Sequence, residues 1–154
     1  MMNQGNSRGS SGVLVAIATI SVLGTACSVP CVTEEQFRVA SPDGKLAAVV
    51  FRHDCGATTD FSTQVSVLPA GASIGNQPGN AFIADVDHNQ SPRASWGGPL
   101  ATVRWRGPRG LVVIYHPLSR VSLEAQSVRV RTGWFRSESI AIEFVRDDGA
   151  RPAG

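Results

Sequence analysis

Two short segments of the chain gather side chains that could do chemistry, and the first is His53-Asp54-Cys55. A nearby imidazole can lower the pKa of a thiol and turn it into a nucleophilic thiolate. Alternate residues of a strand share a face, so His53 and Cys55 could cooperate while Asp54 points to the other side. In an exported chain, however, such a cysteine is more often one half of a disulfide. We favour the disulfide over a reactive thiol at Cys55.

The second segment is the run DVDHN at 85–89, which offers oxygen ligands at alternate positions, as calcium loops do. A calcium loop also requires Gly at its sixth place and Glu at its twelfth. Gln90 and Trp96 occupy those places, so the calcium interpretation fails. Two interpretations of the segment remain: a cation site of another kind, or a polar loop whose side chains accept hydrogen bonds from backbone N–H groups. We favour the polar loop. The residues concerned are Asp85, Asp87 and His88.

The rest of the chain has no catalytic motif. It contains no Gly-x-Ser-x-Gly elbow, no phosphate-binding loop and no two histidines at metal-ligand spacing. We therefore predict no catalytic residue and no cofactor. The alternative is a small periplasmic hydrolase or metal-dependent enzyme built on Asp85, Asp87 and His88, with help from His53. Trp96, Trp105 and Trp134 could form an exposed binding face, although Trp105 alternates with arginines and is expected in the core.

The first part of the chain has the pattern of an export signal. No charged residue occurs between Arg8 and Glu34, and Val13 to Leu23 is an apolar run of eleven residues. A spanning helix needs about 20 apolar residues, so a cleaved signal is the better interpretation. Cleavage could follow Ala26 and leave a lipidated Cys27, although Gly24 stands where a lipoprotein signal prefers Leu. A soluble secreted protein and an uncleaved anchor are the alternatives.

The cysteine count favours lipidation. The chain has three cysteines, Cys27, Cys31 and Cys55, and an odd number in an exported protein leaves one thiol to explain. Acylation of Cys27 would leave Cys31 and Cys55 as a pair in an oxidising compartment. A bridge between Cys27 and Cys31, with Cys55 free, is the rival arrangement.

The elements that must position these residues are short strands. Apolar and polar residues alternate or cluster between turn signals, with no helical period after the leader. The expected strands are 36–40, 46–51, 62–68, 81–86, 103–105, 111–115, 121–131 and 140–144, and 121–131 could instead hold a helical turn. We predict an all-β domain, a small antiparallel sandwich or open barrel of about seven or eight strands. The expected organisation is a signal or anchor at 1–26, a tether at 27–35, the β-domain at 36–146 and a polar tail at 147–154.

The stretch Ser41 to Pro69, SPDGKLAAVVFRHDCGATTDFSTQVSVLP, resembles a group of small bacterial lipoproteins of unknown function. The similar features are the SPDGK turn, the DCGATT run, the STQV strand and, later, GNAFIADVDH at 79–88. The similarity departs at Asp60 and Asn89, where glycine is expected, but Asp and Asn tolerate positive φ better than most residues. The resemblance supports Cys27 as the lipid site and Cys31 with Cys55 as the remaining pair. It implies no known activity.

These observations predict an exported, lipid-anchored protein of the cell envelope, facing the periplasm or the cell exterior. Its β-domain would act by binding or as a structural component, with the membrane and an envelope protein as partners. A nucleic-acid partner is excluded because phosphate binding needs a concentrated positive field. Of fourteen Lys and Arg residues, Arg8 lies in the leader, which leaves thirteen bases against twelve acids.

Overall fold

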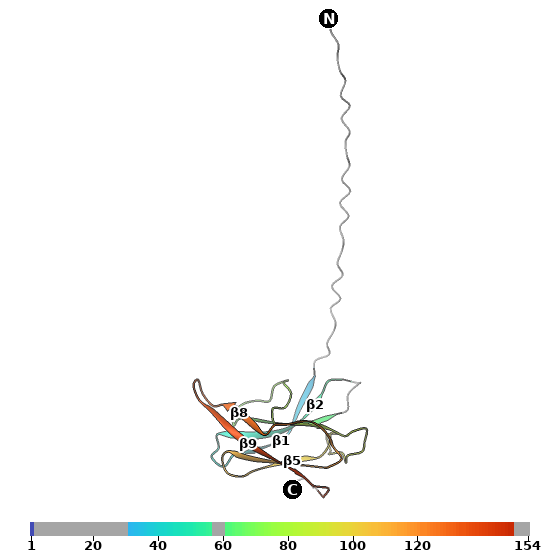
Figure 1. Cartoon of the computed structure of the whole chain (residues 1–154), viewed down its shortest axis with the longest axis vertical. Helices are drawn as coiled ribbons and strands as arrows, with labels where there is room; N and C mark the ends of the chain where they lie inside the picture. The colour runs from blue at the N-terminus through green and yellow to red at the C-terminus, as the bar shows by residue number, and fades with distance from the viewer. Residues whose placement is uncertain (2–30, 57–60, 150–154) are drawn as a thin grey trace.

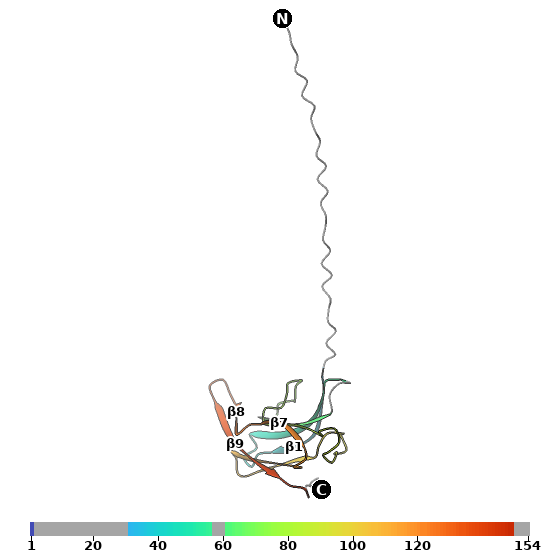
Figure 2. The ribbon, with the colours of Figure 1, turned by 45° about the vertical axis from the view of Figure 1, so that its right-hand side comes forward.

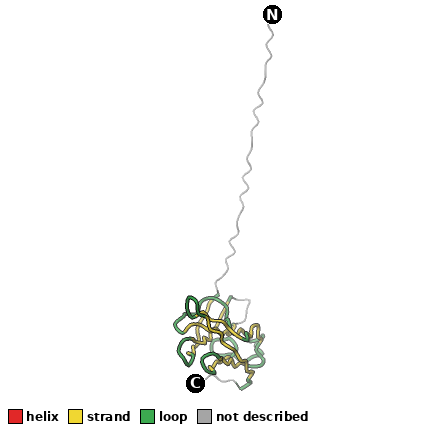
Figure 3. The backbone as a smooth tube through the Cα atoms, turned by 60° about the vertical axis from the view of Figure 1, so that its left-hand side comes forward, coloured by secondary structure: helices red, strands yellow, loops and turns green. Residues whose placement is uncertain are grey.

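The computed structural model describes Met1, residues 31–56 and residues 61–149. These residues form nine strands joined by turns and loops (Figures 1 and 3). The described part of the chain contains no helix that is long and apolar enough to cross a membrane. The expected signal at 1–26, except Met1, and residues 27–30 of the expected tether, including Cys27, lie outside the described residues, as does the end of the tail.

The first sheet has five strands, all antiparallel to their neighbours. In spatial order they are β1 (Val32–Ala40), β2 (Leu46–Asp54), β3 (Ser62–Pro69), β4 (Phe82–Asp85) and β7 (Arg120–Glu124). The first four therefore follow one another along the chain as a meander, and β7 joins them from a distant part of the sequence.

The second sheet has four strands: β5 (Ala101–Trp105), β6 (Gly110–Tyr115), β9 (Ser137–Arg146) and β8 (Ser127–Arg131). The pairs β5–β6 and β8–β9 are antiparallel, whereas β6 and β9 run parallel. A parallel pair requires a crossover. Here β7 supplies part of the crossover, because the chain leaves the second sheet after β6, adds β7 to the first sheet and then returns as β8 and β9.

One core lies between the two sheets and is filled by alternate residues of the strands. The first sheet contributes Leu46, Ala48, Val50, Val65, Val67, Phe82 and Ala84. The second contributes Ala101, Val103, Leu111, Val113, Tyr115, Val128, Val130, Ile140 and Ile142. The domain is therefore a β-sandwich, one of the two architectures that the sequence predicted.

Strand β2 is buried on both faces, which explains its nearly continuous apolar sequence. Ala47, Val49 and Phe51 point away from the main core and pack with Leu68 and Ile74 in a second, smaller cluster. The loop that contains Ile74 is fastened to the sheet from β1. Arg38 Nη1 on β1 donates to the carbonyl oxygens of Ala70 and Ala72, at 3.0 and 3.1 Å.

A polar contact closes the sandwich beside β7. The buried Tyr115 hydroxyl on β6 donates to Glu124 on β7 and accepts a 3.0 Å hydrogen bond from Arg146 Nε on β9. Burial raises the pKa of Tyr115, and Arg146 opposes that effect. The neutral hydroxyl therefore links the two sheets at a point where an unpaired polar group would cost stability.

The all-β prediction is confirmed, with three differences in detail. The expected single segment 121–131 is two strands, β7 and β8, that belong to different sheets, and it holds no helix. The count is nine strands rather than seven or eight, and one pair is parallel. Strand β1 begins at Val32, inside the expected tether, because pairing with β2 continues as far as Val32 opposite Asp54.

Candidate functional site

The segment that the sequence singled out at 85–89 forms a tight turn after β4. Strand β4 ends at Asp85, and Asp87, His88 and Asn89 follow with φ of 44°, 54° and 73°. Asp85 Oδ1 accepts the Asp87 backbone N–H at 2.9 Å, and the Ser91 N–H returns to the Val86 carbonyl oxygen at 3.1 Å. The left-handed conformation at Asn89 agrees with the expectation that an asparagine could stand in for glycine there.

The two carboxylates of this turn face an arginine from β7. Arg120 donates to Asp85 Oδ2 from Nε and Nη2, at 3.0 and 2.7 Å, and its Nη1 lies 3.6 Å from Asp87 Oδ1. Asp87 also accepts a hydrogen bond from Gln90 at 3.2 Å. A guanidinium in this position binds Asp85 Oδ2 directly and places a positive charge beside both carboxylates, where a cation would otherwise be needed. The arrangement is that of a polar loop closed by an ion pair.

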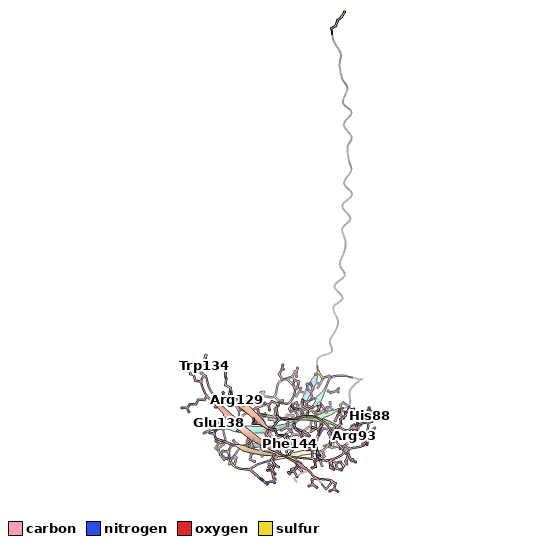
Figure 4. The ribbon with its side chains drawn as sticks, viewed as in Figure 1. His88, Arg93, Arg129, Trp134, Glu138 and Phe144 are labelled. Atoms are coloured by element: carbon pink, nitrogen blue, oxygen red, sulfur yellow. A yellow bond between two sulfur atoms is a disulfide. The ribbon has the colours of Figure 1, made fainter. Side chains whose placement is uncertain are left out.

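The third candidate ligand, His88, is exposed on the surface (Figure 4). The structure places Asp85, Asp87 and His88 in one turn but does not bring them together as a set of ligands. Within residues 31–56 and 61–149, the one group of three metal-ligating side chains that converges is Cys31, His53 and Cys55. The geometry therefore supports the polar-loop interpretation of this turn.

Replacement of His88 by valine should destabilise the domain more than replacement by glycine, by about 1–2 kcal/mol. The reason is the φ of 54° at His88, which glycine adopts freely and a β-branched residue resists. Urea unfolding of both variants measures the difference. At Arg104, an exposed residue of strand β5, the same two substitutions should rank in the opposite order, because valine favours strands. Equal stability of the two His88 variants would contradict the strain argument.

The other candidate segment contributes to a disulfide. Cys31, immediately before β1, is bonded to Cys55, immediately after β2, across 24 positions of the sequence. The prediction of this pair is confirmed, and the rival bridge from Cys27 to Cys31 is not formed. As a disulfide, the two sulfurs are neither thiolate nucleophiles nor strong metal ligands, so the chemistry that the sequence offered at Cys55 is used for cross-linking.

His53 lies beside this disulfide and is buried. Its Nδ1 is 2.9 Å from the Thr33 hydroxyl on β1, and its backbone carbonyl oxygen accepts a hydrogen bond from Ser62 on β3. The imidazole ring also lies perpendicular to the ring of Phe51, with centroids 6.4 Å apart. Asp54 does not contact the imidazole in the hydrogen bond that it makes: its Oδ1 accepts the Gly56 backbone N–H at 2.9 Å. The three residues of the segment therefore hold the joined ends of β1 and β2 together, and they do not form a catalytic group.

The three tryptophans do not form one face. Trp96 and Trp105 pack against the core, and their indole N–H groups donate to the Thr63 hydroxyl and the Val39 carbonyl oxygen. Trp134 is 91% exposed, and its neighbour Phe135 is 100% exposed. Both lie in the turn between β8 and β9, and Phe135 was not among the predicted site residues. The signal in the sequence is a pair of adjacent aromatic residues inside an acid-free stretch, 125–137.

Comparisons of the chain with protein-family models, with curated proteins and with solved structures found no match.

Proposed function

We propose that the protein is exported and lipid-anchored in the cell envelope through Cys27, and that its β-sandwich acts there by binding or as a structural component. The observation that carries the proposal is the Cys31–Cys55 bridge. Of the three cysteines, it leaves Cys27 outside the pair, after an apolar segment that carries no charge from residue 9 onwards. A disulfide suits an oxidising compartment, and a lipid on Cys27 accounts for the odd thiol. The resemblance at Ser41–Pro69 to small lipoproteins supports the same assignment.

Binding is favoured over catalysis by what the candidate groups contact. The carboxylates of Asp85 and Asp87 are engaged by Arg120, and the Cys55 sulfur is bonded to Cys31. A general base or nucleophile needs a free lone pair within reach of a substrate. A hydrolase or metal enzyme at Asp85, Asp87 and His88 would first have to break the ion pair with Arg120.

Membrane fractionation of the full chain in a bacterial host, with intact-mass measurement, tests the anchor. The expected species begins at Cys27 and carries a diacylglyceryl adduct, and its mass rises by about 2 Da on reduction of one disulfide. Cys27→Ala should move the protein out of the membrane fraction.

The matched control is Cys55→Ala, which removes a different cysteine and should leave the chain in the membrane fraction. A Cys27→Ala protein that fractionates like the unaltered chain would overturn the lipid anchor. A mass that retains Met1 would indicate an uncleaved leader.

A further inference from the structure

The strongest unexplained feature of the surface is the β8–β9 tip, residues 131–136. Trp134 and Phe135 are almost fully exposed there, and in Figure 4 Trp134 projects from the body of the domain. Buried valines of β8 alternate with outward-facing arginines that lead up to the tip. Exposure of two adjacent aromatic side chains is costly in water and marks a surface that contacts something apolar.

Strand β8 and the tip carry only positive charges. The nearest acidic residue on the neighbouring strand, Glu138 on β9, lies opposite Val130 and is paired with Arg109 at 3.6 Å. The stretch 125–137 contains Arg129, Arg131 and Arg136 and no acidic residue. None of the three arginines makes an ion pair within the part of the chain that the structure describes, although five other arginines of the domain do. Arginines on an edge strand such as β8 also discourage sheet-to-sheet association, but that role does not account for the aromatic residues at the tip.

The tip and the start of β1 reach the same side of the domain, although they lie apart along that side, as Figures 1 and 2 show from two directions. Cys27 precedes Cys31 by four residues, which span at most about 14 Å. The disulfide fixes Cys31 to the domain. A lipid on Cys27 would therefore hold this end of the sandwich, and with it the tip, close to the bilayer surface.

We propose that the β8–β9 tip is a membrane-contact site that places Trp134 and Phe135 in the interface of an anionic bilayer. Tryptophan is favoured at the level of lipid headgroups, where its ring is apolar and its N–H remains hydrated. Arginine side chains next to it attract anionic phosphate groups. This proposal rests on the proposed anchor, because the anchor sets which side of the domain faces the membrane. The tip would add a second, anion-dependent contact that fixes the orientation of the domain on the membrane.

The test uses the full chain reconstituted in vesicles of phosphatidylcholine with or without phosphatidylglycerol. Trp134 emission should shift to the blue and become protected from acrylamide on vesicles with phosphatidylglycerol. The contribution of Trp134 is obtained by subtracting the emission of a Trp134→Leu protein, which retains Trp96 and Trp105. Arg131→Gln with Arg136→Gln should weaken the tip's association by roughly fivefold for each arginine removed.

Two matched controls use residues outside the tip. Arg104→Gln removes an exposed arginine of β5, and Leu118→Ser removes an exposed apolar side chain from the turn after β6. Neither should change the emission of Trp134. Since all the altered side chains are exposed, folding is expected to be retained, and unfolding curves check it.

Vesicle flotation separates the two proposals. A chain that floats with both kinds of vesicle while acrylamide reaches Trp134 freely would leave the anchor standing and overturn the membrane-contact site. A chain that floats only with phosphatidylglycerol, and needs Trp134 to do so, would support the contact site without the anchor. A chain that floats with neither would overturn both. Crosslinking of a water-exposed Trp134 tip to an envelope protein would make it a protein-docking loop instead.

Discussion

Replacement of Phe82 by alanine is expected to destabilise the domain by about 3–5 kcal/mol. Phe82 lies on β4 with no exposed surface. Its ring centroid is 4.9 Å from that of Tyr115 on β6 and 6.0 Å from that of Phe144 on β9, so it joins the first sheet to the second. Alanine would remove the transfer energy of the ring and leave a cavity between sheets that cannot close freely.

Urea unfolding followed by circular dichroism measures this loss. The matched control is Phe135→Ala, the same substitution at a side chain that is 100% exposed, which should change stability by at most about 0.5 kcal/mol. Phe82→Leu keeps much of the apolar volume, so its loss of stability should lie between those of the two alanine variants, below about 1.5 kcal/mol. Equal unfolding midpoints for Phe82→Ala and Phe135→Ala would contradict the position of Phe82 in the core.

Removal of the disulfide is the second large effect. Cys31→Ala combined with Cys55→Ala should destabilise the domain by roughly 3 kcal/mol, because the unfolded chain regains the freedom of a loop of about 25 residues. The first pairs of β1 with β2 are expected to fray most, since Val32 opposite Asp54 and Thr33 opposite His53 lie next to the bridge. Hydrogen exchange of the β1 amides would report that local opening.

Cys27→Ala is the matched control for this variant, since it removes a cysteine outside the bridge and should leave the stability of the sandwich unchanged. Thiol titration of the unreduced protein is the direct check on the pairing. The expected result is that Cys31 and Cys55 do not react. A reactive thiol at Cys55 would contradict the structural role and return the segment around His53 to consideration as a redox site.

Loss of the bridge also bears on how the domain is oriented. With the bridge intact, the position of Cys31 relative to the β8–β9 tip is set by the fold. Without it, β1 could separate from β2 at its first pairs, and the chain between Cys27 and the sandwich would lengthen. Protection of Trp134 on anionic vesicles is therefore expected to weaken in the Cys31→Ala, Cys55→Ala protein, even where the remaining sandwich stays folded.

Several features of this protein could be predicted from the sequence because a few neighbouring residues encode them. The turn at 41–45 is an example: the Ser41 hydroxyl donates to Asp43 at 2.7 Å, and Gly44 adopts a φ of +70°. These contacts are local, so SPDGK predicts the β1–β2 hairpin wherever it lies in the fold. Alternation of apolar residues likewise predicted most strands, and the odd number of cysteines favoured the Cys31–Cys55 bridge over its rival.

Other features depend on residues far apart in the chain. The sequence leaves a cation site at Asp85 and Asp87 open beside the favoured polar loop, and the contact with Arg120 from β7 supports the polar loop. Nothing in the sequence of 121–131 indicates that β7 and β8 belong to different sheets. That division follows from the crossover that brings β9 parallel to β6. Strand pairing of this kind is decided by which arrangement buries the most apolar surface once all strands are present.

The same division applies to the surface. The acid-free stretch 125–137 and its two adjacent aromatic residues are visible in the sequence, but a Trp-Phe pair in a β protein is ordinarily core. Only the tertiary structure shows that Trp134 and Phe135 are exposed to solvent. They lie at the end of a hairpin that contributes Val128 and Val130 to the core. Turn chemistry and alternation are determined over a few residues, whereas burial is determined by the space that the rest of the chain leaves.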